Sequence, residues 1–384
     1  MTDPVVVGII GGGQLAMMMI EAAAAIDVEC RVLARPHDES VRGIGHAVVS
    51  TDIVDPHAVE SFARRVDVIT FDHEPVDALA ISAVEAAERA GHLVFPSSAV
   101  LRFSDKEYQR RRFSELGIPV PPFVVTNDIQ VVESFAAEHG WPVVLKVPRG
   151  GYDGRGVNVC VDRSEARGVL DTVGQAVVVE PMLALDAELS VVVVRDRAGN
   201  ALVYPLVDTV QHDGICHQVT VPSGVSDSLA GRAREIALQV VEAVDAVGVL
   251  AVELFVVDGE VSVNEVAPRP HNSGHLTIEA CETSQFENHL RAVAGLPLGS
   301  CELIAPAAAM VNLIAGGDDP VQDEQRRDDA APPDGSAATE FVHWYHKRPR
   351  ADRKVGHVTV VASTADEAAA AAHCLAGELM MANV

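Results

Sequence analysis

The sequence predicts a doubly wound α/β domain followed by an α+β region, and three patterns lead to this fold class. Residues 1–96 alternate short apolar strands with helices, which is typical of a parallel sheet with helical crossovers. From residue 123 onward, hairpins with glycine-rich turns replace this alternation. An acidic, Pro/Gly-rich stretch at 316–340, predicted to be loop or partly disordered, precedes a strand-rich tail. The 384 residues suffice for two or three domains.

The N-terminal pattern places strands at 5–10, 30–34, 67–71 and 93–95, and helices at 14–25, 56–65 and 77–90. Ser97 and Ser98 are predicted to cap a further helix that ends near Gly117, and residues 118–122 read as a linker.

The second region has strands at 143–147, 156–161, 176–180, 189–194 and 201–207, then a long helix at 227–247. A hairpin with an Asp258-Gly259 turn follows, because this dipeptide favours a type I′ turn. Strands at 341–345 and 357–361 lead to a last helix, which a Thr364…Glu367 capping box opens.

Composition excludes several classes of protein. No apolar run approaches the roughly 20 residues of a membrane helix, and residues 2–4 lack the basic start of a signal peptide. The six cysteines are scattered without a close pair, which fits reduced thiols in a cytoplasm rather than a zinc site or disulfides. A net charge of −26 disfavours nucleic acid and anionic membrane surfaces as partners.

The same charge means that any phosphate site must be a local basic pocket. Arginine supplies almost all positive charge, and only four lysines occur: Lys106, Lys146, Lys347 and Lys354. Lysines kept in such a chain can mark positions that need a compact ammonium group rather than a planar guanidinium.

The loop at 11–16 fits G-x-G-x-x-G/A directly after a strand, a pattern that directs backbone N–H groups and a helix N-terminus at a phosphate. A dinucleotide site would also need an acid at the end of the second strand, which here ends in Ala34-Arg35. The pattern therefore favours a nucleotide monophosphate over NAD, and a tight structural turn is the remaining alternative.

The loop at 146–157 (KVPRGGYDGRGV) combines four glycines with three cations, which suits a flexible cover for phosphates. It is not a Walker A loop, because no Gly-Lys-Ser/Thr follows. The alternative is a plain glycine-rich hairpin, which would not need Lys146 on the strand that enters it.

Three oxygen-bearing side chains in the Asp258-Gly259 hairpin suggest a magnesium site. Regular hairpin register puts Glu253 opposite Asn264, and these oxygens suit Mg²⁺, which takes one or two carboxylates plus phosphates. A regular pleat would point Glu265 to the other face, so a metal site requires a bulge or strand end there. The alternative for Glu253 is a solvated strand carboxylate.

Two more segments are unusually polar or basic. Residues 267–275 (APRPHNSGH) follow the hairpin, and Arg269 suits an oxyanion or carboxylate, although either histidine could instead be a hydrogen-bonded structural residue. Residues 347–354 (KRPRADRK) form the main basic run of an acidic chain, with a solvated charged turn as the alternative.

Together these segments resemble the 5-(carboxyamino)imidazole ribonucleotide synthases of the ATP-grasp superfamily. The likeness runs over nearly the whole chain and rests on residues 8–15 (GIIGGGQL), 150–156 (GGYDGRG), 264–275 (NEVAPRPHNSGH) and 356–358 (GHV). The second and third segments are highly specific. The resemblance implies an ATP-grasp fold with an N-terminal Rossmann-like domain at 1–97, an ATP-grasp domain at 98–298 with a lid at about 123–185, and a small β-rich C-terminal domain at 299–384.

The resemblance also implies where ligands bind, with ATP between the lid hairpin and the large sheet and Mg²⁺ on Glu253 and Glu265. The residues expected at ATP are Arg102, Lys146, Gly151, Tyr152, Asp153, Gly154, Arg155, Gly156, Val157, Glu180, Pro181, Met182, Leu183, Glu188, Gln211, Asn264 and Glu265. Those expected at aminoimidazole ribonucleotide are Gly12, Gly13, Gln14, Glu74, Tyr152, Asp153, Arg155, Lys347, Arg353 and Lys354. The expected catalytic residues are Arg269, His271, Asn272, Asp153 and Lys354. The first three of these would handle bicarbonate and carboxyphosphate, and Asp153 is the candidate proton acceptor.

Three positions depart from the family pattern. Ala16-Met17 stands where members often carry a small residue and then arginine, and Gln211 stands where some place a nucleotide-contacting histidine. The turn at 72–75 (DHEP) is a variant, which puts the role of Glu74 in question.

The implied reaction is ATP-dependent carboxylation of aminoimidazole ribonucleotide by bicarbonate in purine (IMP) biosynthesis, by a cytoplasmic homodimer. Another ATP-grasp ligase, such as a formate-dependent glycinamide ribonucleotide transformylase or a biotin carboxylase, is the nearest alternative. An NAD oxidoreductase and a non-catalytic ATP-binding module are more distant alternatives. The missing ribose acid argues against the first, and the intact Glu253 and Glu265 argue against the second.

Overall fold

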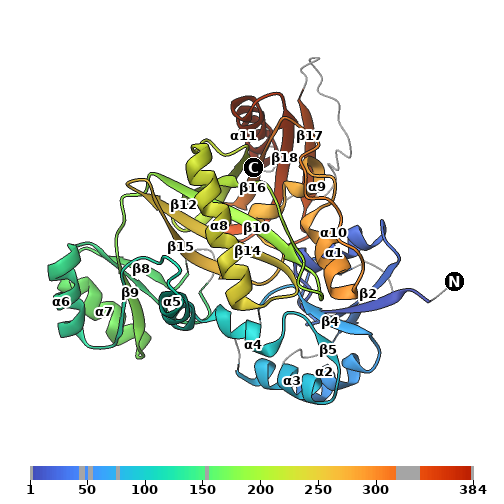
Figure 1. The fold of residues 1–384 in the computed structure, drawn as a ribbon, viewed down its shortest axis with the longest axis horizontal. Helices are drawn as coiled ribbons and strands as arrows, with labels where there is room; N and C mark the ends of the chain where they lie inside the picture. Colours follow the sequence, from blue (N-terminus) through green and yellow to red (C-terminus); the bar gives the residue numbers. More distant parts are fainter. Residues whose placement is uncertain are drawn as a thin grey trace.

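A computed structural model describes residues 3–42, 48–50, 55–74, 78–151, 155–316 and 338–381. Its strands form three sheets (Figure 1), and the helices pack on their faces. Among the described residues no helix is both long and apolar enough to cross a membrane. All six cysteines are free thiols, as their scattered positions predicted.

The N-terminal sheet is fully parallel, in the order β3-β2-β1-β4-β5. Its strands are β1 (Val5–Ile10), β2 (Val28–Ala34), β3 (Val48–Ser50), β4 (Val68–Phe71) and β5 (Leu93–Val94). The doubly wound prediction is therefore confirmed. Only β3 was not predicted, since its three residues are too short to give a periodic pattern.

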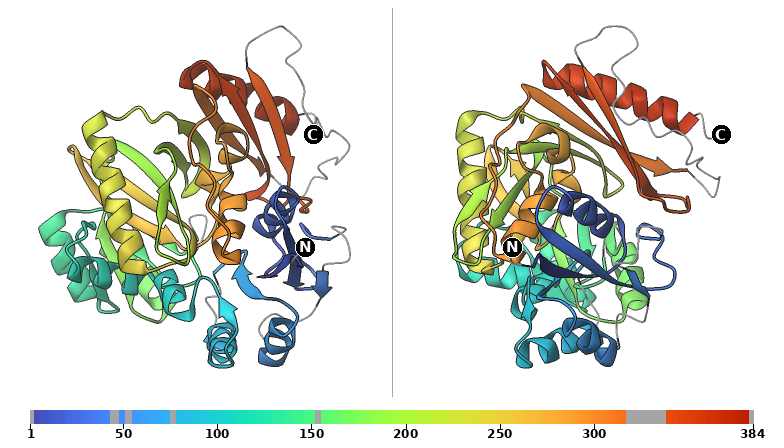
Figure 2. Two further views of the ribbon diagram at one scale, coloured as in Figure 1. Left: turned by 45° about the vertical axis from the view of Figure 1, so that its right-hand side comes forward. Right: turned by 90° about the vertical axis from the view of Figure 1, so that its right-hand side faces the viewer.

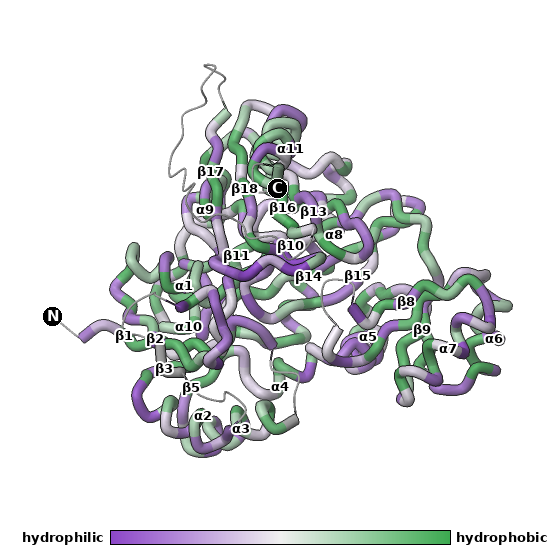
Figure 3. The backbone as a smooth tube through the Cα atoms, turned by 180° about the vertical axis from the view of Figure 1, so that it is seen from behind, coloured by the Kyte–Doolittle hydropathy of each residue, from purple (hydrophilic) through white to green (hydrophobic). Residues whose placement is uncertain are grey.

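Helices cover both faces of this sheet because successive β1 side chains point to opposite sides. Val7 and Ile9 pack in a core with helices α1 (Gln14–Ala23) and α10 (Gln285–Ala294), whereas Ile10 packs with α2 (Pro56–Ala63) and α3 (Ala78–Arg89). Helix α10 thus comes from a segment far along the chain and lies against the N-terminal domain (Figure 2). In Figure 3 the strands of this sheet carry hydrophobic stretches (green) between the helix layers.

The single helix predicted after Ser97 is wrong, because the chain breaks into three pieces there. These are α4 (Ser98–Leu101), a 3-10 helix (Arg102–Ser104) and α5 (Lys106–Glu115). Ser97 caps α4 as expected, but Asp105 adopts an extended backbone and accepts a hydrogen bond from the Tyr108 N–H (3.1 Å), which starts a new helix. The break places Lys106 at a helix start, where its N–H donates to the Pro148 carbonyl (2.8 Å) of the glycine-rich turn.

A four-stranded antiparallel sheet in the order β6-β9-β7-β8 forms a separate body, with its helices on the outside (Figure 1). Its strands are β6 (Val124–Thr126), β7 (Val143–Lys146), β8 (Val157–Cys160) and β9 (Val177–Pro181). Helices α6 (Ile129–His139) and α7 (Arg163–Val173), which were not predicted, share a core with one face of the sheet. The opposite face carries Lys146, Val157 and Glu180, which the register brings together.

The largest sheet runs through the centre of the molecule in the order β15-β14-β10-β12-β13-β16-β18-β17, with β11 paired to β10. Its strands are β10 (Ala187–Arg195), β11 (Ala201–Val203), β12 (Val207–His212), β13 (Ile215–Val221), β14 (Gly248–Val257), β15 (Glu260–Ala267), β16 (Ala307–Ala315), β17 (Thr339–Trp344) and β18 (Arg353–Ala362). The last three strands extend the central sheet, so it crosses the predicted boundary at residue 298.

Helices pack on several parts of this sheet, and Ala292 of α10 shares a core with β10 and β14. Helix α8 (Asp227–Val244) packs on the β10–β14–β15 part, and α11 (Ala365–Met381) packs on β16 and β18. The predicted cap of α11 is confirmed, since the Glu367 N–H donates to Thr364 Oγ1 (3.3 Å). The predicted loop at 316–340 falls mostly on 317–337, outside the described residues.

Candidate active site

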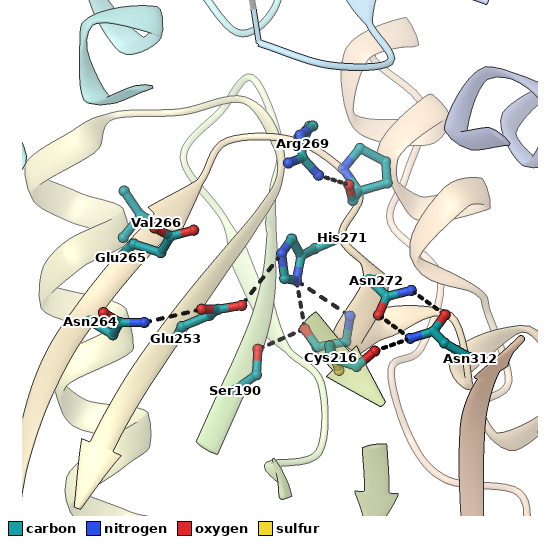
Figure 4. A network of polar contacts seen from close by, with 12 residues as sticks. Ser190, Cys216, Glu253, Asn264, Glu265, Val266, Arg269, His271, Asn272 and Asn312 are labelled. Atoms are coloured by element: carbon teal, nitrogen blue, oxygen red, sulfur yellow. Dashed lines mark hydrogen bonds and ion pairs between the residues drawn. The ribbon is translucent and has the colours of Figure 1, made fainter. Parts of the chain in front are cut away.

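A β-bulge in the β14–β15 hairpin puts two carboxylates side by side. Pairing is regular from Val257↔Glu260 to Leu254↔Val263, and then Glu253 pairs with Glu265 instead of with Asn264. The predicted Glu253–Asn264 register is therefore wrong by one residue, whereas the predicted bulge is confirmed. Asn264 is the extra residue, and its Nδ2 still donates to Glu253 Oε2 (3.3 Å), so all three side chains meet (Figure 4).

These two carboxylates have very different proton affinities. Burial first, and then the charge of Glu265, raise the pKa of Glu253 to about 7. Burial would also raise the pKa of Glu265, but the Lys106 ammonium, which is ion-paired with Glu265 Oε2, lowers it to about 2. Glu265 is thus ionised at neutral pH, whereas Glu253 is about half protonated near pH 7.

A second charge cluster lies on the inner face of the four-stranded sheet. Glu180 is almost fully buried and accepts from Arg110 Nε (2.5 Å) and from Lys146 Nζ (2.7 Å). Burial opposes its ionisation, but Lys146 and Arg110 hold its pKa at about 2. Lys146 Nζ also donates to Asn264 Oδ1 (3.2 Å), which joins this cluster to the bulge.

The loop after β15 brings a histidine to the carboxylate pair. His271 Nε2 lies 3.5 Å from Glu253 Oε1 (Figure 4). The other ring nitrogen, Nδ1, lies 2.9 Å from Ser273 Oγ. Arg269 Nε forms an ion pair with Glu74 Oε2 (2.7 Å) of the N-terminal domain. The loop therefore lies between the two domains, with the predicted residues Arg269 and His271 both facing acids.

Asn272 takes a structural position in this loop. Its amide exchanges two hydrogen bonds with the amide of Asn312 (3.0 and 2.7 Å), and Asn312 also donates to the Cys216 carbonyl (2.9 Å). This pairing fastens the loop to strands β13 and β16 of the central sheet.

In the glycine loop after β1, one backbone N–H group already has a side-chain partner. The Gly13 N–H donates to the buried Asp72 carboxylate, which also contacts His73 Nδ1. Gly11 has a φ of +105°, a conformation that L side chains rarely adopt, so the turn needs glycine there. Asp72 therefore occupies one N–H donor of this loop, and the phosphate site predicted there stays a prediction.

The basic tail is divided between two places. Lys347 Nζ contacts Gln14 Oε1, and Arg353 donates to Glu39 Oε2 (3.1 Å), so both lie against the N-terminal domain. Lys354 is buried on β18. Burial has the largest effect on the pKa values of Glu253 and His275, and the Lys354 charge lowers both pKa values. The prediction that Lys347, Arg353 and Lys354 hold one phosphate stays a prediction, and Lys354 differs from the other two in being buried on β18.

Comparison with known proteins decides the family. The ribonucleotide synthetase preATP-grasp domain matches residues 5–105, the ATP-grasp domain matches 111–286, and the phosphoribosylaminoimidazole carboxylase C-terminal domain matches 308–371. The N5-carboxyaminoimidazole ribonucleotide synthase of Mycobacterium bovis is 39% identical over 96% of this chain and 87% of its own length. The chain belongs to the N5-carboxyaminoimidazole ribonucleotide synthases.

Solved structures of the family have the same fold. An ADP complex of an N5-carboxyaminoimidazole ribonucleotide synthetase superposes with a TM-score of 0.87 at 29% identity, over 100% of this chain and 98% of the other. The Aspergillus clavatus synthase in complex with ADP and 5-aminoimidazole ribonucleotide superposes with a TM-score of 0.84 at 30% identity, over 99% of both chains. The predicted ATP-grasp fold and ligase family are confirmed.

The remaining residues expected at ATP in this synthase family lie around the inner face of the four-stranded sheet and the neighbouring central strands. Val157 pairs with Lys146, and Glu188 on β10 is half-buried, which raises its pKa. Met182 is exposed just after β9, where its N–H donates to the Pro142 carbonyl (3.1 Å). Pro181 is the last residue of β9, and Leu183 follows Met182. Gln211 lies at a bulge of β12. Gly151, Arg155 and Gly156 belong to the glycine-rich segment between β7 and β8.

Tyr152, Asp153 and Gly154 lie outside the described residues. Arg102 is exposed and its guanidinium lies 4.8 Å from the centre of the Tyr108 ring, which is a cation–π contact.

Lys106 and Arg110 were not predicted from the sequence as site residues. Like Lys146, each of them forms an ion pair with a glutamate of the site. Both lie on α5, and Arg110 is one helical turn beyond Lys106, so they face the same side. The scarcity of lysine was a signal that could have found Lys106. Arg110 gave no such signal, because arginine is common in this chain.

The donor set around the bulge fits Mg²⁺. The negative charges of Glu253 and Glu265 are not fully neutralised by nearby cations, since the pKa of Glu253 is raised by burial and by Glu265. The side-chain amide of Asn264 lies beside the two carboxylates. No cluster of three His, Cys, Asp or Glu side chains that could hold a metal occurs in the described part of the chain. Such a set suits Mg²⁺, which commonly completes its coordination with substrate phosphates and water.

Proposed function

We propose that this chain uses ATP and bicarbonate to convert 5-aminoimidazole ribonucleotide to N5-carboxyaminoimidazole ribonucleotide, a step of purine (IMP) biosynthesis. The observation that carries the proposal is the position of the Glu253–Glu265 pair. It lies between two lysines, Lys146 of the inner sheet face and Lys106 of α5, and the Arg269–His271 loop, which touches the N-terminal domain. Phosphate, metal and acceptor groups could therefore meet at one place.

ATP would lie along the inner face of the four-stranded sheet. Lys146 and Lys106 would neutralise its phosphates, and Val157 would supply apolar contact. Glu253 and Glu265 would hold Mg²⁺, which when bound supplies charge neutralisation at the β- and γ-phosphates.

The chemistry then needs positioned cations and exclusion of water. A bicarbonate oxygen attacks the γ-phosphorus, the bond to the ADP oxygen breaks, and carboxyphosphate forms. Carboxyphosphate divides into CO₂ and phosphate, and the substrate amine attacks CO₂ and loses a proton. Arg269 and His271 would orient the bicarbonate oxygens, and Lys354 adds positive charge from the sheet. Asp153, outside the described residues, remains the proposed proton acceptor.

The ribonucleotide would bind between the N-terminal domain and the Arg269 loop. Its phosphate would lie near Gln14 and Lys347, whose contact brings the tail to the first helix. Glu74 would face the aminoimidazole from its ion pair with Arg269. The expected cytoplasmic homodimer remains a proposal, which light scattering after size exclusion can test for the oligomeric state.

A substrate-omission assay tests the function. ADP release should require 5-aminoimidazole ribonucleotide, bicarbonate and Mg²⁺ together with ATP, and mass spectrometry of [¹³C]bicarbonate reactions should show the carboxylated ribonucleotide. Formate with glycinamide ribonucleotide should give no ADP release. Turnover with formate and none with bicarbonate would replace this proposal with the transformylase alternative.

A further inference from the structure

A buried glutamine outside the catalytic loop holds the main chain of His271 from both sides. Gln285 is the first residue of helix α10 and is fully buried. Its Oε1 accepts from the His271 N–H (2.9 Å), and its Nε2 donates to the His271 carbonyl (2.7 Å). The side-chain amide therefore satisfies both polar backbone groups of a single residue.

The same amide reaches a second histidine of the loop. Gln285 Nε2 lies 3.2 Å from His275 Nδ1, and His275 is also fully buried. Burial, followed by the charge of His271, keeps the pKa of His275 well below its ordinary value, so His275 is neutral and can accept at Nδ1. One side chain thus fixes both ends of the 271–275 turn.

Gly274 and Thr277 pack closely around the Gln285 residue. A Cβ on Gly274 would overlap the Gln285 carboxamide, so the glycine permits the close approach. Thr277 Oγ1 accepts from the Gln285 N–H (2.9 Å) and donates to the Gly274 carbonyl (2.6 Å). The start of α10 and the loop are therefore joined by a continuous set of hydrogen bonds.

We propose that Gln285 is a positioning residue for the carboxylation reaction: by clamping the His271 main chain, it fixes the direction of the His271 imidazole toward Glu253. This inference rests on the proposed function, because it assigns His271 to the bicarbonate step. The His271 side chain has a partner on each ring nitrogen, Glu253 and Ser273, and both contacts depend on where its backbone lies. A misplacement of about 1 Å at such a site can reduce the rate about 100-fold.

Helix α10 provides a matched control one turn further on. Asn288 is also fully buried and clamps Gly299 in the same way, with Oδ1 accepting from its N–H (2.8 Å) and Nδ2 donating to its carbonyl (3.1 Å). Gly299 precedes the C-terminal strands, and Asn288 makes its other contacts with Tyr204 and Cys301. Replacing either amide by the isosteric acid removes donors from a buried clamp on the same helix.

The test compares Gln285→Glu with Asn288→Asp in the full-length enzyme, below the melting temperature of each variant. We expect Gln285→Glu to lower kcat/KM for bicarbonate about 10- to 100-fold, with the KM for ATP within about twofold of the wild type. Asn288→Asp should lower the melting temperature while both kinetic parameters stay near the wild-type values. Gly274→Ala should reproduce the Gln285→Glu pattern, since the added methyl group displaces the same amide.

The outcomes separate this inference from the proposed function. If the wild-type enzyme shows no bicarbonate-dependent ADP release, the proposed function fails before Gln285 is tested. If the wild type is active and Gln285→Glu keeps normal kinetics for bicarbonate, or if both amide variants lose bicarbonate and ATP kinetics equally, Gln285 is only structural. A Gln285→Glu variant that does not fold leaves Gly274→Ala to decide by the same kinetic comparison.

Discussion

Glu253 should release a proton when Mg²⁺ and ATP bind. Burial and the adjacent Glu265 raise its pKa to about 7, whereas a carboxylate must be ionised to bind a cation. A group with this pKa carries about 0.9 proton at pH 6 and about 0.1 at pH 8. Binding should therefore release nearly one proton at pH 6 and almost none at pH 8, and affinity for Mg·ATP should rise about tenfold over this range.

The same pKa predicts how the stability of the nucleotide-free enzyme changes with pH. Since the folded-state pKa of Glu253 lies above its ordinary value of 4.5, this group favours the folded state at low pH. That contribution is lost as the pH rises through about 7. Saturating Mg·ATP should remove the decline, because a bound cation favours the ionised carboxylate in the folded state.

Isothermal titration calorimetry in two buffers with different ionisation enthalpies measures the number of protons released. Glu253→Gln is the comparison protein, and the difference between the two proteins removes the titration of ATP itself. Equal proton release by wild type and variant at pH 6, or an affinity that does not change between pH 6 and pH 8, would refute the assignment of this pKa to Glu253.

Three further predictions concern charged residues. Glu265→Gln should lower turnover by orders of magnitude while circular dichroism shows an intact fold, and near-normal activity at limiting Mg²⁺ would exclude it as a metal ligand. Lys106→Met should raise the KM for ATP about 10-fold or more in ADP-release assays, because a phosphate loses a cation and Glu265 loses its partner; an unchanged KM would leave Lys106 with a structural role. Lys347→Met should raise the KM for the ribonucleotide because its ammonium lies at Gln14, whereas Lys354→Met should reduce kcat with little change in that KM. The reverse result for the two lysines would contradict the divided tail.

Much of the fold could be predicted because its signals are local. The parallel N-terminal sheet, the Asp258-Gly259 hairpin and the Thr364 cap all follow from short-range pattern and turn chemistry. The helix after Ser97 shows the limit of such reasoning. Its residues favour helix throughout, but Asp105 satisfies the Tyr108 N–H with its own side chain and restarts the helix.

The sequence indicated which residue types the site contains, but not which residues contact one another. The sequence required a bulge near Glu265 for a metal site, yet only the pairing of Val263 with Leu254 shows that Asn264 is the inserted residue. Partners such as Asp72 at the Gly13 N–H lie about sixty residues away in the chain, and no periodicity connects them. Long-range pairings of this kind are decided by the packing of whole domains.

The charge arrangement suggests how a chain of net charge −26 can bind ATP at all. Its site does not hold a surplus of cations, since Lys106 is paired with Glu265, and Lys146 and Arg110 share Glu180. When phosphates take Lys106, Glu265 loses its partner and two carboxylates remain together, which is costly in a buried site. A divalent cation offsets that cost, and the phosphates in turn complete its coordination. Nucleotide and metal should therefore each increase the affinity for the other by the same factor, because the phosphates take Lys106 away from Glu265 and the metal neutralises the carboxylates that remain.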